Sequence, residues 1–220
     1  GLGVHDSSSA LIPYLKEIKT PFHLFSTGTW GIALNAFAPF IMTEEDAKKD
    51  CLYYLTYQGK PVRASRLFLG GEHDHQAARI AARFAVSVDQ VKNSGWNRDI
   101  MAARLKAGLK SLSQSLIPSR MAGTGPLPGL NKEGKEWDLS PFLSHEEAYH
   151  QLIVDLAVLS AVTLRQLAKP LTQDSRLRTP DSPLYVDGGF SRSEIFMKAL
   201  TSISPWQPVY AAEIPQSTAL

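Results

Sequence analysis

The sequence has little of what marks secreted, membrane-spanning or nucleic-acid-binding proteins. A single cysteine, Cys51, cannot form a disulfide within the chain, which fits a reducing compartment. No Asn-x-Ser/Thr acceptor occurs, and the longest apolar run, residues 152–164, is broken by Asp155 and is shorter than the roughly 20 residues that span a bilayer. A net charge of +2 is too small to indicate nucleic acid or an anionic membrane as a partner. These absences favour a cytoplasmic protein.

The two ends of the sequence look cut. It has no initiating Met, its residues 2–4 read as the end of a buried strand, and residues 215–220 read as a turn followed by the start of a helix. A helix that stops after its first turn is unfavourable, because nucleation costs entropy that later hydrogen bonds must offset. We therefore expect the sequence to be part of a longer protein.

What is present is an alternation of β-prone and helical segments over 220 residues, of which 44% are hydrophobic. The predicted strands cover residues 22–26, 30–34, 51–57, 62–69, 184–186 and 209–211. The predicted helices cover residues 72–84, 99–112, 144–169 and 191–203, with capping-box patterns at 87–90, 144–147 and 191–194. Two early hairpins followed by strand–helix alternation predict an α/β fold, a mixed sheet with helices on both faces.

Asp6 is the first candidate for chemistry. It follows an apolar strand-like segment and precedes residues 7–12, which can open a helix. A carboxylate at the carboxyl end of a strand can serve as a helix N-cap, a metal ligand or a general base, and the cap is the commonest of these. The segment alone leaves the three roles open.

Two turns are candidate binding loops. Gly28 lies between the hydroxyls of Thr27 and Thr29 at a predicted hairpin tip, which suits phosphate oxygens but also an ordinary tight turn. Gly188 and Gly189 separate a strand from a helix N-terminus, where a flat base or an anion could approach the backbone, or where the two elements could simply pack closely.

Other features carry less information. The pair Gly70-Gly71 either admits a ligand or only separates a strand from the helix expected from residue 72. His73 and His75 form a His-x-His pair without a cysteine pair or carboxylate at metal spacing, so a solvated surface is favoured over zinc. We also assign a solvated helix face to the basic residues Arg79, Arg83, Lys92, Arg98, Arg104, Lys106 and Lys110.

The order of these elements resembles a known family. An Asp after the first strand, a Thr-Gly-Thr hairpin tip about twenty residues later and a late Asp-Gly-Gly turn look like the C-terminal lobe of the FGGY carbohydrate kinases. The resemblance covers essentially the whole chain, and the His-Asp pair and Ser-Thr-Gly-Thr-Trp look most like the kinases for L-fuculose and L-rhamnulose. It is strongest at residues 3–7, 26–30, 186–191 and 208–220.

The resemblance implies an actin-like (ribonuclease H-like) ATPase lobe that binds ATP with Mg²⁺. Asp6 matches the catalytic base, which takes the proton of the sugar hydroxyl as it attacks the γ-phosphorus. The positions that match nucleotide-binding residues are Thr27, Gly28 and Thr29 for the phosphates, Gly188, Gly189 and Ser193 for the adenosine, and Gly71, or its neighbour Gly70, for the other side of the nucleotide.

The same resemblance implies a partner. Residues 1–220 would be the C-terminal nucleotide-binding domain, and an N-terminal lobe with an Asp-x-Gly-Thr hairpin, the Mg²⁺-associated carboxylate and most of the sugar pocket would complete the enzyme; no metal-ligating residue is assigned in this chain. The expected substrate is a ketose or deoxyketose such as L-fuculose, L-rhamnulose or xylulose. The isolated chain is expected to be inactive and, with an uncovered apolar surface, able to form a homodimer. The alternative is a non-catalytic module of the same fold that binds a nucleotide or a protein.

Overall fold

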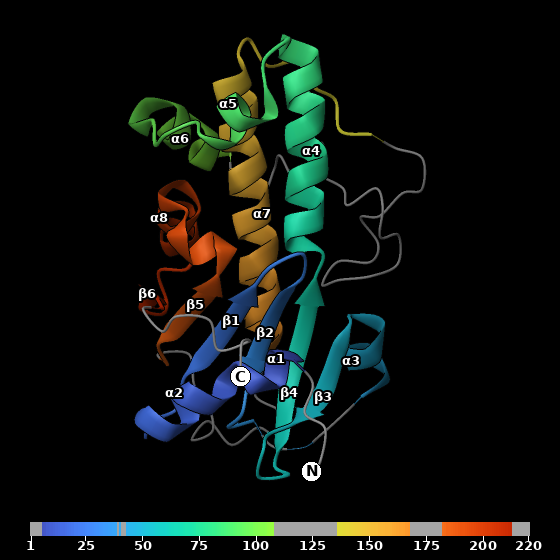
Figure 1. Cartoon of the computed structure of the whole chain (residues 1–220), viewed down its shortest axis with the longest axis vertical. Coiled ribbons are helices and arrows are strands. Elements are labelled where there is room, and N and C mark those ends of the chain that lie inside the picture. The colour runs from blue at the N-terminus through green and yellow to red at the C-terminus, as the bar shows by residue number, and fades with distance from the viewer. Residues whose placement is uncertain (1–5, 39, 41–42, 108–135, 168–181, 213–220) are drawn as a thin grey trace.

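The computed structural model describes residues 6–38, 40, 43–107, 136–167 and 182–212 (Figure 1). The strand expected at residues 2–4, the end of the helix expected at 99–112 and the helix start expected near residue 217 lie outside these ranges.

A six-stranded sheet forms the centre of the molecule, in the order β3-β4-β2-β1-β5-β6. β1, β2, β4 and β3 pair antiparallel, whereas β5 runs parallel to β1 and β6 parallel to β5. The mixed sheet confirms the predicted fold class. The strands are β1 (His23–Thr27), β2 (Gly31–Asn35), β3 (Cys51–Leu55), β4 (Pro61–Leu67), β5 (Leu184–Gly188) and β6 (Val209–Ala211).

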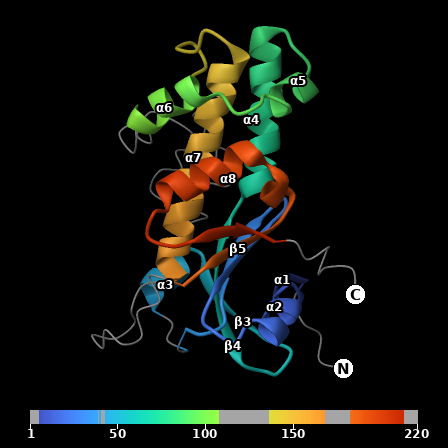
Figure 2. The ribbon, with the colours of Figure 1, turned by 90° about the vertical axis from the view of Figure 1, so that its left-hand side faces the viewer.

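Helices cover both faces of this sheet. α7 crosses one face, with α4 and α8 packed against it, and α1 and α2 lie on the opposite face (Figure 2). α5 and α6 pack against α7 beyond the sheet, and α3 packs beside β3. The helices are α1 (Asp6–Ser9), α2 (Leu11–Glu17), α3 (Glu44–Lys48), α4 (Leu69–Phe84), α5 (Val88–Lys92), α6 (Arg98–Ala107), α7 (His145–Leu167) and α8 (Glu194–Ile203), with a 3₁₀ turn, η4 (Gly189–Arg192), before α8.

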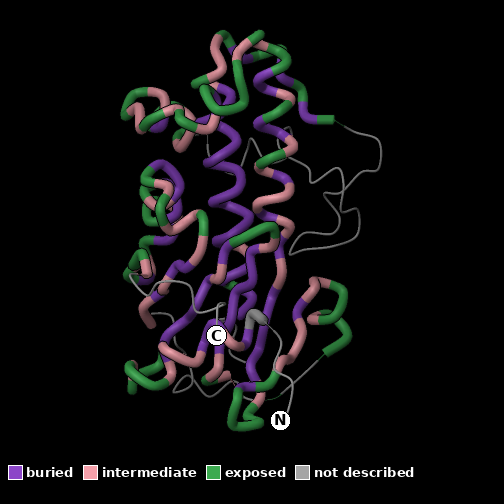
Figure 3. The backbone as a smooth tube through the Cα atoms, viewed as in Figure 1, coloured by how far each residue is buried: buried purple, intermediate pink, exposed green. Residues whose placement is uncertain are grey.

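The alternation of side chains along the strands explains the two cores. In β1 and β2, Leu24 and Leu34 point to the α2 face and pack with Leu11, whereas Phe25 and Ala33 point to the α7 face. α7 is buried along nearly its whole length (Figure 3), because the sheet, α4 and α8 surround it. None of the described helices has both the length and the apolar character needed to cross a membrane.

Two helix starts differ from the prediction. α4 begins at Leu69, so Gly70 and Gly71 lie in its first turn instead of separating it from β4. At the other site, α8 begins after Ser193, whose Oγ accepts a hydrogen bond from the Phe196 amide, while the Ser191 hydroxyl donates to the Gly188 carbonyl. Contacts with residues distant in the sequence decide where α4 begins, and the short 3₁₀ turn η4 decides where α8 begins.

Candidate functional site

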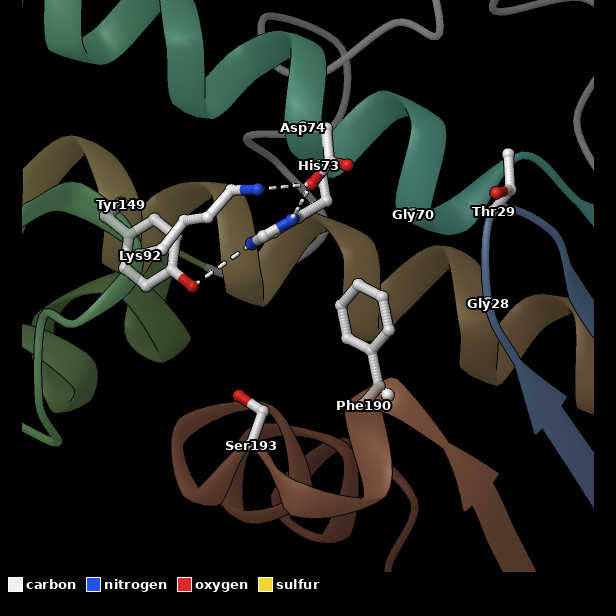
Figure 4. A pocket seen from close by; sticks show the side chains of 10 residues that line it. Gly28, Thr29, Gly70, His73, Asp74, Lys92, Tyr149, Phe190 and Ser193 are labelled. Carbon is white, nitrogen blue, oxygen red and sulfur yellow. Dashed lines mark hydrogen bonds and ion pairs between the residues drawn. The ribbon is translucent and has the colours of Figure 1, made fainter. Parts of the chain in front are cut away.

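A cavity of about 340 Å³ opens where the β1–β2 hairpin tip meets the first turns of α4 and η4 (Figure 4). Its size is at the low end for small-molecule sites. The walls come from five parts of the chain: the hairpin tip, α4, α5, α7 and the segment from η4 to α8. The lining residues are Gly28, Thr29, Gly70, His73, Asp74, Lys92, Tyr149, Gly189, Phe190 and Ser193.

The hairpin tip is hydrogen-bonded directly to the start of α4. The Gly70 amide donates to the carbonyl oxygens of Gly28 (3.2 Å) and Thr29 (3.0 Å), and the Gly71 amide donates to the Thr29 carbonyl (3.1 Å). The first amides of a helix have no partner within the helix, and here the tip supplies acceptors for two of them. A Cβ at Gly70 would overlap the Gly28 carbonyl oxygen, so this close approach requires glycine.

The turn after β5 is held to β1 by a buried hydroxyl. Thr27 Oγ1 donates to the Asp187 carbonyl and accepts a hydrogen bond from the Phe190 amide (3.1 Å). Gly188, which pairs with Thr27 across the two strands, has φ +87° and ψ −153°, a conformation that is essentially restricted to glycine. A Cβ at Gly188 would also overlap the Thr27 carbonyl oxygen. Thr27 and Gly188 therefore shape the turn from behind the cavity.

Gly28 and Gly189 differ from the other glycines of the site. A Cβ built at Gly189 would meet no atom within 4 Å, and one at Gly28 would meet only the Trp30 carbonyl oxygen, at 3.9 Å. Neither has a positive φ. The fold itself therefore does not require glycine at these two positions, and both have open space in front of their backbone. That is the arrangement expected where a ligand lies against the main chain.

At the other end of the cavity, four side chains form a hydrogen-bonded chain. Lys92 Nζ donates to Asp74 Oδ1 (2.8 Å), His73 Nδ1 lies 3.0 Å from the same oxygen, and His73 Nε2 lies 3.1 Å from the Tyr149 hydroxyl. The His73 ring also contacts the Phe190 ring edge-on, with 5.3 Å between the ring centroids. Figure 4 shows this group facing the hairpin tip across the cavity.

The environment sets the charge of each member. Burial lowers the pKa of His73, against a smaller opposing effect of Asp74, so the imidazole is neutral at pH 7. Burial raises the pKa of Tyr149 to about 12, which keeps its hydroxyl protonated. Burial also acts to raise the pKa of Asp74, but hydrogen bonds from Lys92 and His73 outweigh it and lower the pKa, so this carboxylate is ionised.

Comparison with known proteins assigns the fold to a family. A family model described as the carbohydrate kinase FGGY C-terminal domain matches residues 19–220. The chain belongs to this family. No curated protein matched the chain. The predicted ribonuclease H-like lobe of an FGGY kinase is thereby confirmed as the fold.

Solved structures show the same fold at low sequence identity. A carbohydrate kinase from Novosphingobium aromaticivorans is 24% identical with a TM-score of 0.61, covering 98% of this chain and 42% of that one. Xylulose kinase from Bifidobacterium adolescentis is 15% identical (TM-score 0.58, coverage 97% and 37%). Plasmodium falciparum glycerol kinase with ADP is 12% identical (TM-score 0.60, coverage 97% and 39%). The FGGY domain thus spans about two fifths of the length of these proteins.

The structure brings most of the predicted binding residues of the FGGY domain together. Four of them line the cavity: Gly28, Thr29, Gly189 and Ser193. Two others, Thr27 and Gly188, hold the turn behind it. A Cβ at Gly71 would overlap the Phe68 ring. The residue that lines the cavity is its neighbour Gly70 instead of Gly71. Which of these residues contact a nucleotide stays a prediction.

Sequence reasoning missed the end of the cavity formed by His73, Asp74, Lys92, Tyr149 and Phe190. The solvated surface predicted for His73 is wrong, because its side chain is only 13% exposed and is hydrogen-bonded in the cavity. Lys92 likewise pairs with Asp74 at the cavity instead of lying on a free helix face. The spacing of the residues of α4 that line the cavity, 70, 73 and 74, places them on one helix face, which is the signal that could have found them.

Two further expectations concern Asp6 and metals. Asp6 is the first residue of α1, on the sheet face opposite α7, but its side chain lies outside the described part of the structure. Its role as a base therefore stays a prediction. Within the described residues, no group of three or more His, Cys, Asp or Glu is arranged to hold a metal ion.

Proposed function

We propose that the complete protein is an ATP-dependent sugar kinase and that residues 1–220 are its C-terminal, nucleotide-binding lobe. The observation that carries the proposal is the pair Gly28 and Gly189, whose backbones face open space in the cavity although the fold does not require glycine at either position. Together with membership of the FGGY family, this supports a ligand that lies along the main chain from the hairpin tip to η4.

The two ends of the cavity suit the two ends of a nucleotide. The hairpin tip offers the exposed Thr29 hydroxyl, which can donate a hydrogen bond to a phosphate oxygen. The far end is formed by the rings of His73 and Phe190, with the hydroxyl of Ser193 nearby, and suits a flat base and its ribose.

The proposed chemistry rests on Asp6. As an ionised carboxylate it orients the sugar hydroxyl and accepts its proton while the hydroxyl oxygen attacks the γ-phosphorus, and ADP leaves with the electrons of the broken P–O bond. Mg²⁺, when bound to the phosphates, would neutralise part of their negative charge. The protein ligands of this ion are proposed to lie on the N-terminal lobe, as the resemblance to the FGGY kinases implies.

The substrate we propose is a ketose or deoxyketose, with L-fuculose, L-rhamnulose and D-xylulose as the candidates. The proposed location is the cytoplasm, consistent with the single thiol of Cys51, which is free and buried. Without the other lobe, the isolated FGGY domain is expected to bind nucleotide but to transfer no phosphoryl group.

The test is ADP release by the complete protein on a panel of L-fuculose, L-rhamnulose, D-xylulose and glycerol. We expect one ketose or deoxyketose to support turnover and Asp6→Asn to lower kcat by about 10²- to 10⁴-fold, the usual range for a lost general base, with ADP affinity and melting temperature unchanged. Asp89→Asn, at an exposed position of α5, is the matched control. Full activity of Asp6→Asn would remove Asp6 as the base, and ADP binding without turnover on any sugar would favour the non-catalytic alternative.

A further inference from the structure

The hydrogen-bonded chain at the far end of the cavity fixes the protonation of His73. A carboxylate can only accept hydrogen bonds, so His73 Nδ1 carries the proton and donates it to Asp74 Oδ1 (3.0 Å). His73 Nε2 is then the acceptor and receives the Tyr149 hydroxyl (3.1 Å). Both ring nitrogens are engaged by the protein, so what His73 offers the cavity is an uncharged aromatic ring.

This ring is held from several directions. Lys92 of α5 anchors Asp74 (2.8 Å), Tyr149 of α7 holds the second nitrogen, and the Phe190 ring lies against the imidazole. Phe190 is in turn packed against the Phe196 ring, at 4.8 Å between centroids. The rings of His73 and Phe190 therefore form an aromatic wall that contacts from α5, α7 and α8 hold in place, and a wall held in this way loses little freedom when a ligand binds.

We propose that His73 is a binding residue for the nucleobase, which lies against its neutral ring beside Phe190. The inference rests on the proposed function, because it assigns one end of the proposed nucleotide site. Figure 4 shows the His73 and Phe190 rings between the hairpin tip and the Tyr149–Lys92 end of the cavity. Stacking of a base on an aromatic ring contributes enough that loss of the ring weakens binding by about 5- to 150-fold.

The experiment distinguishes binding of the base from binding of the phosphates, and the contribution of the His73 ring from that of its nitrogen atoms. Dissociation constants of ADP and of tripolyphosphate, which has no base, are measured by calorimetry for the complete protein and for His73→Ala, His73→Phe and His145→Ala. The last removes a half-buried histidine at the start of α7, outside the cavity, and is the matched control.

We expect His73→Ala to weaken ADP binding about tenfold, to leave tripolyphosphate binding within twofold and to melt as a folded protein. His73→Phe, which keeps a ring but no nitrogens, retains ADP affinity within about threefold. Unchanged ADP affinity in His73→Ala overturns the inference, as does equal loss for both ligands or a Phe variant as weak as the Ala variant. If the unmodified protein binds neither ligand, the proposed function itself fails, which is distinguishable from a failure confined to the His73 variants.

Discussion

Two adjacent glycines, Gly188 at the end of β5 and Gly189 at the start of η4, are expected to have opposite roles, and alanine substitution distinguishes them. Gly188→Ala introduces a side chain at φ +87° and ψ −153° and drives its Cβ into the Thr27 carbonyl oxygen. The backbone conformation costs about 1–3 kcal/mol, and relief of the overlap by moving β1 from β5 costs about 1–3 kcal/mol more. The free energy of unfolding therefore falls by about 2–6 kcal/mol, a large part of the roughly 5–15 kcal/mol typical of folded proteins.

Gly189→Ala meets neither obstacle. Gly189 opens a 3₁₀ turn, its φ is not positive, and no atom lies within 4 Å of the added Cβ. Restricting the unfolded chain makes the change neutral or stabilising by up to about 1 kcal/mol. Because Gly189 lines the cavity, we expect the new methyl group to obstruct a ligand that lies against this backbone and to lower ADP affinity by about tenfold or more.

Thermal unfolding with and without ADP measures both effects. For a chain of this size each kcal/mol shifts the melting temperature by roughly 2–4 °C, so Gly188→Ala melts well below the unmodified protein and Gly189→Ala melts with it. ADP is expected to raise the melting temperature of the unmodified protein and much less that of Gly189→Ala. Normal ADP affinity in Gly189→Ala, or equal loss of stability in both variants, would refute the reasoning.

Two further predictions concern stability. Thr27→Val removes the hydroxyl that donates to the Asp187 carbonyl and accepts from the Phe190 amide, so urea unfolding should show a free energy of unfolding lower by about 1–3 kcal/mol. Thr201→Val, on the exposed face of α8, is the control, and equal stability of the two variants would contradict the role of Thr27. Acid should destabilise the domain as the pH falls below 6.5. A histidine whose pKa is lowered in the folded state binds fewer protons there than in the unfolded chain, so its contribution to stability is full above the ordinary pKa of 6.5. That contribution is lost as the pH falls towards the lowered pKa, by up to about 1.4 kcal/mol per pH unit for each histidine. His23→Asn should flatten the profile, and a pH-independent unfolding free energy would contradict the prediction; the histidines concerned are His23, His73 and His150.

The sheet could be predicted because its signal is local. In β1 and β2, residues that alternate along the chain alternate between the two cores, and the Thr-Gly-Thr turn between them fixes the hairpin. The helix starts were harder to predict. Gly70 and Gly71 are expected to end a helix until it is known that their amides donate hydrogen bonds to carbonyls of the hairpin tip. Contacts with residues about forty positions away in the chain therefore override the low helix propensity of glycine here.

The part of the candidate site that contains glycines in turns could be predicted from the sequence. The part that depends on contacts between residues far apart in the chain could not. Gly28 and Gly189 are visible in the sequence as parts of turns. The role of His73 depends on a hydrogen bond with Tyr149, 76 residues later in the chain. It also depends on the position of Lys92, which lies on the separate short helix α5. A neutral buried histidine and a solvated one look alike in a sequence, because the difference lies in what surrounds the ring.

The first amides of α4, those of Gly70 and Gly71, already donate hydrogen bonds to the hairpin tip. A phosphate at the tip cannot draw on those two donors without breaking bonds within the protein. Moving the tip relative to the helix from Leu69 to Phe84 would break these same hydrogen bonds, so the stability of the tip is coupled to that of the first turn of α4.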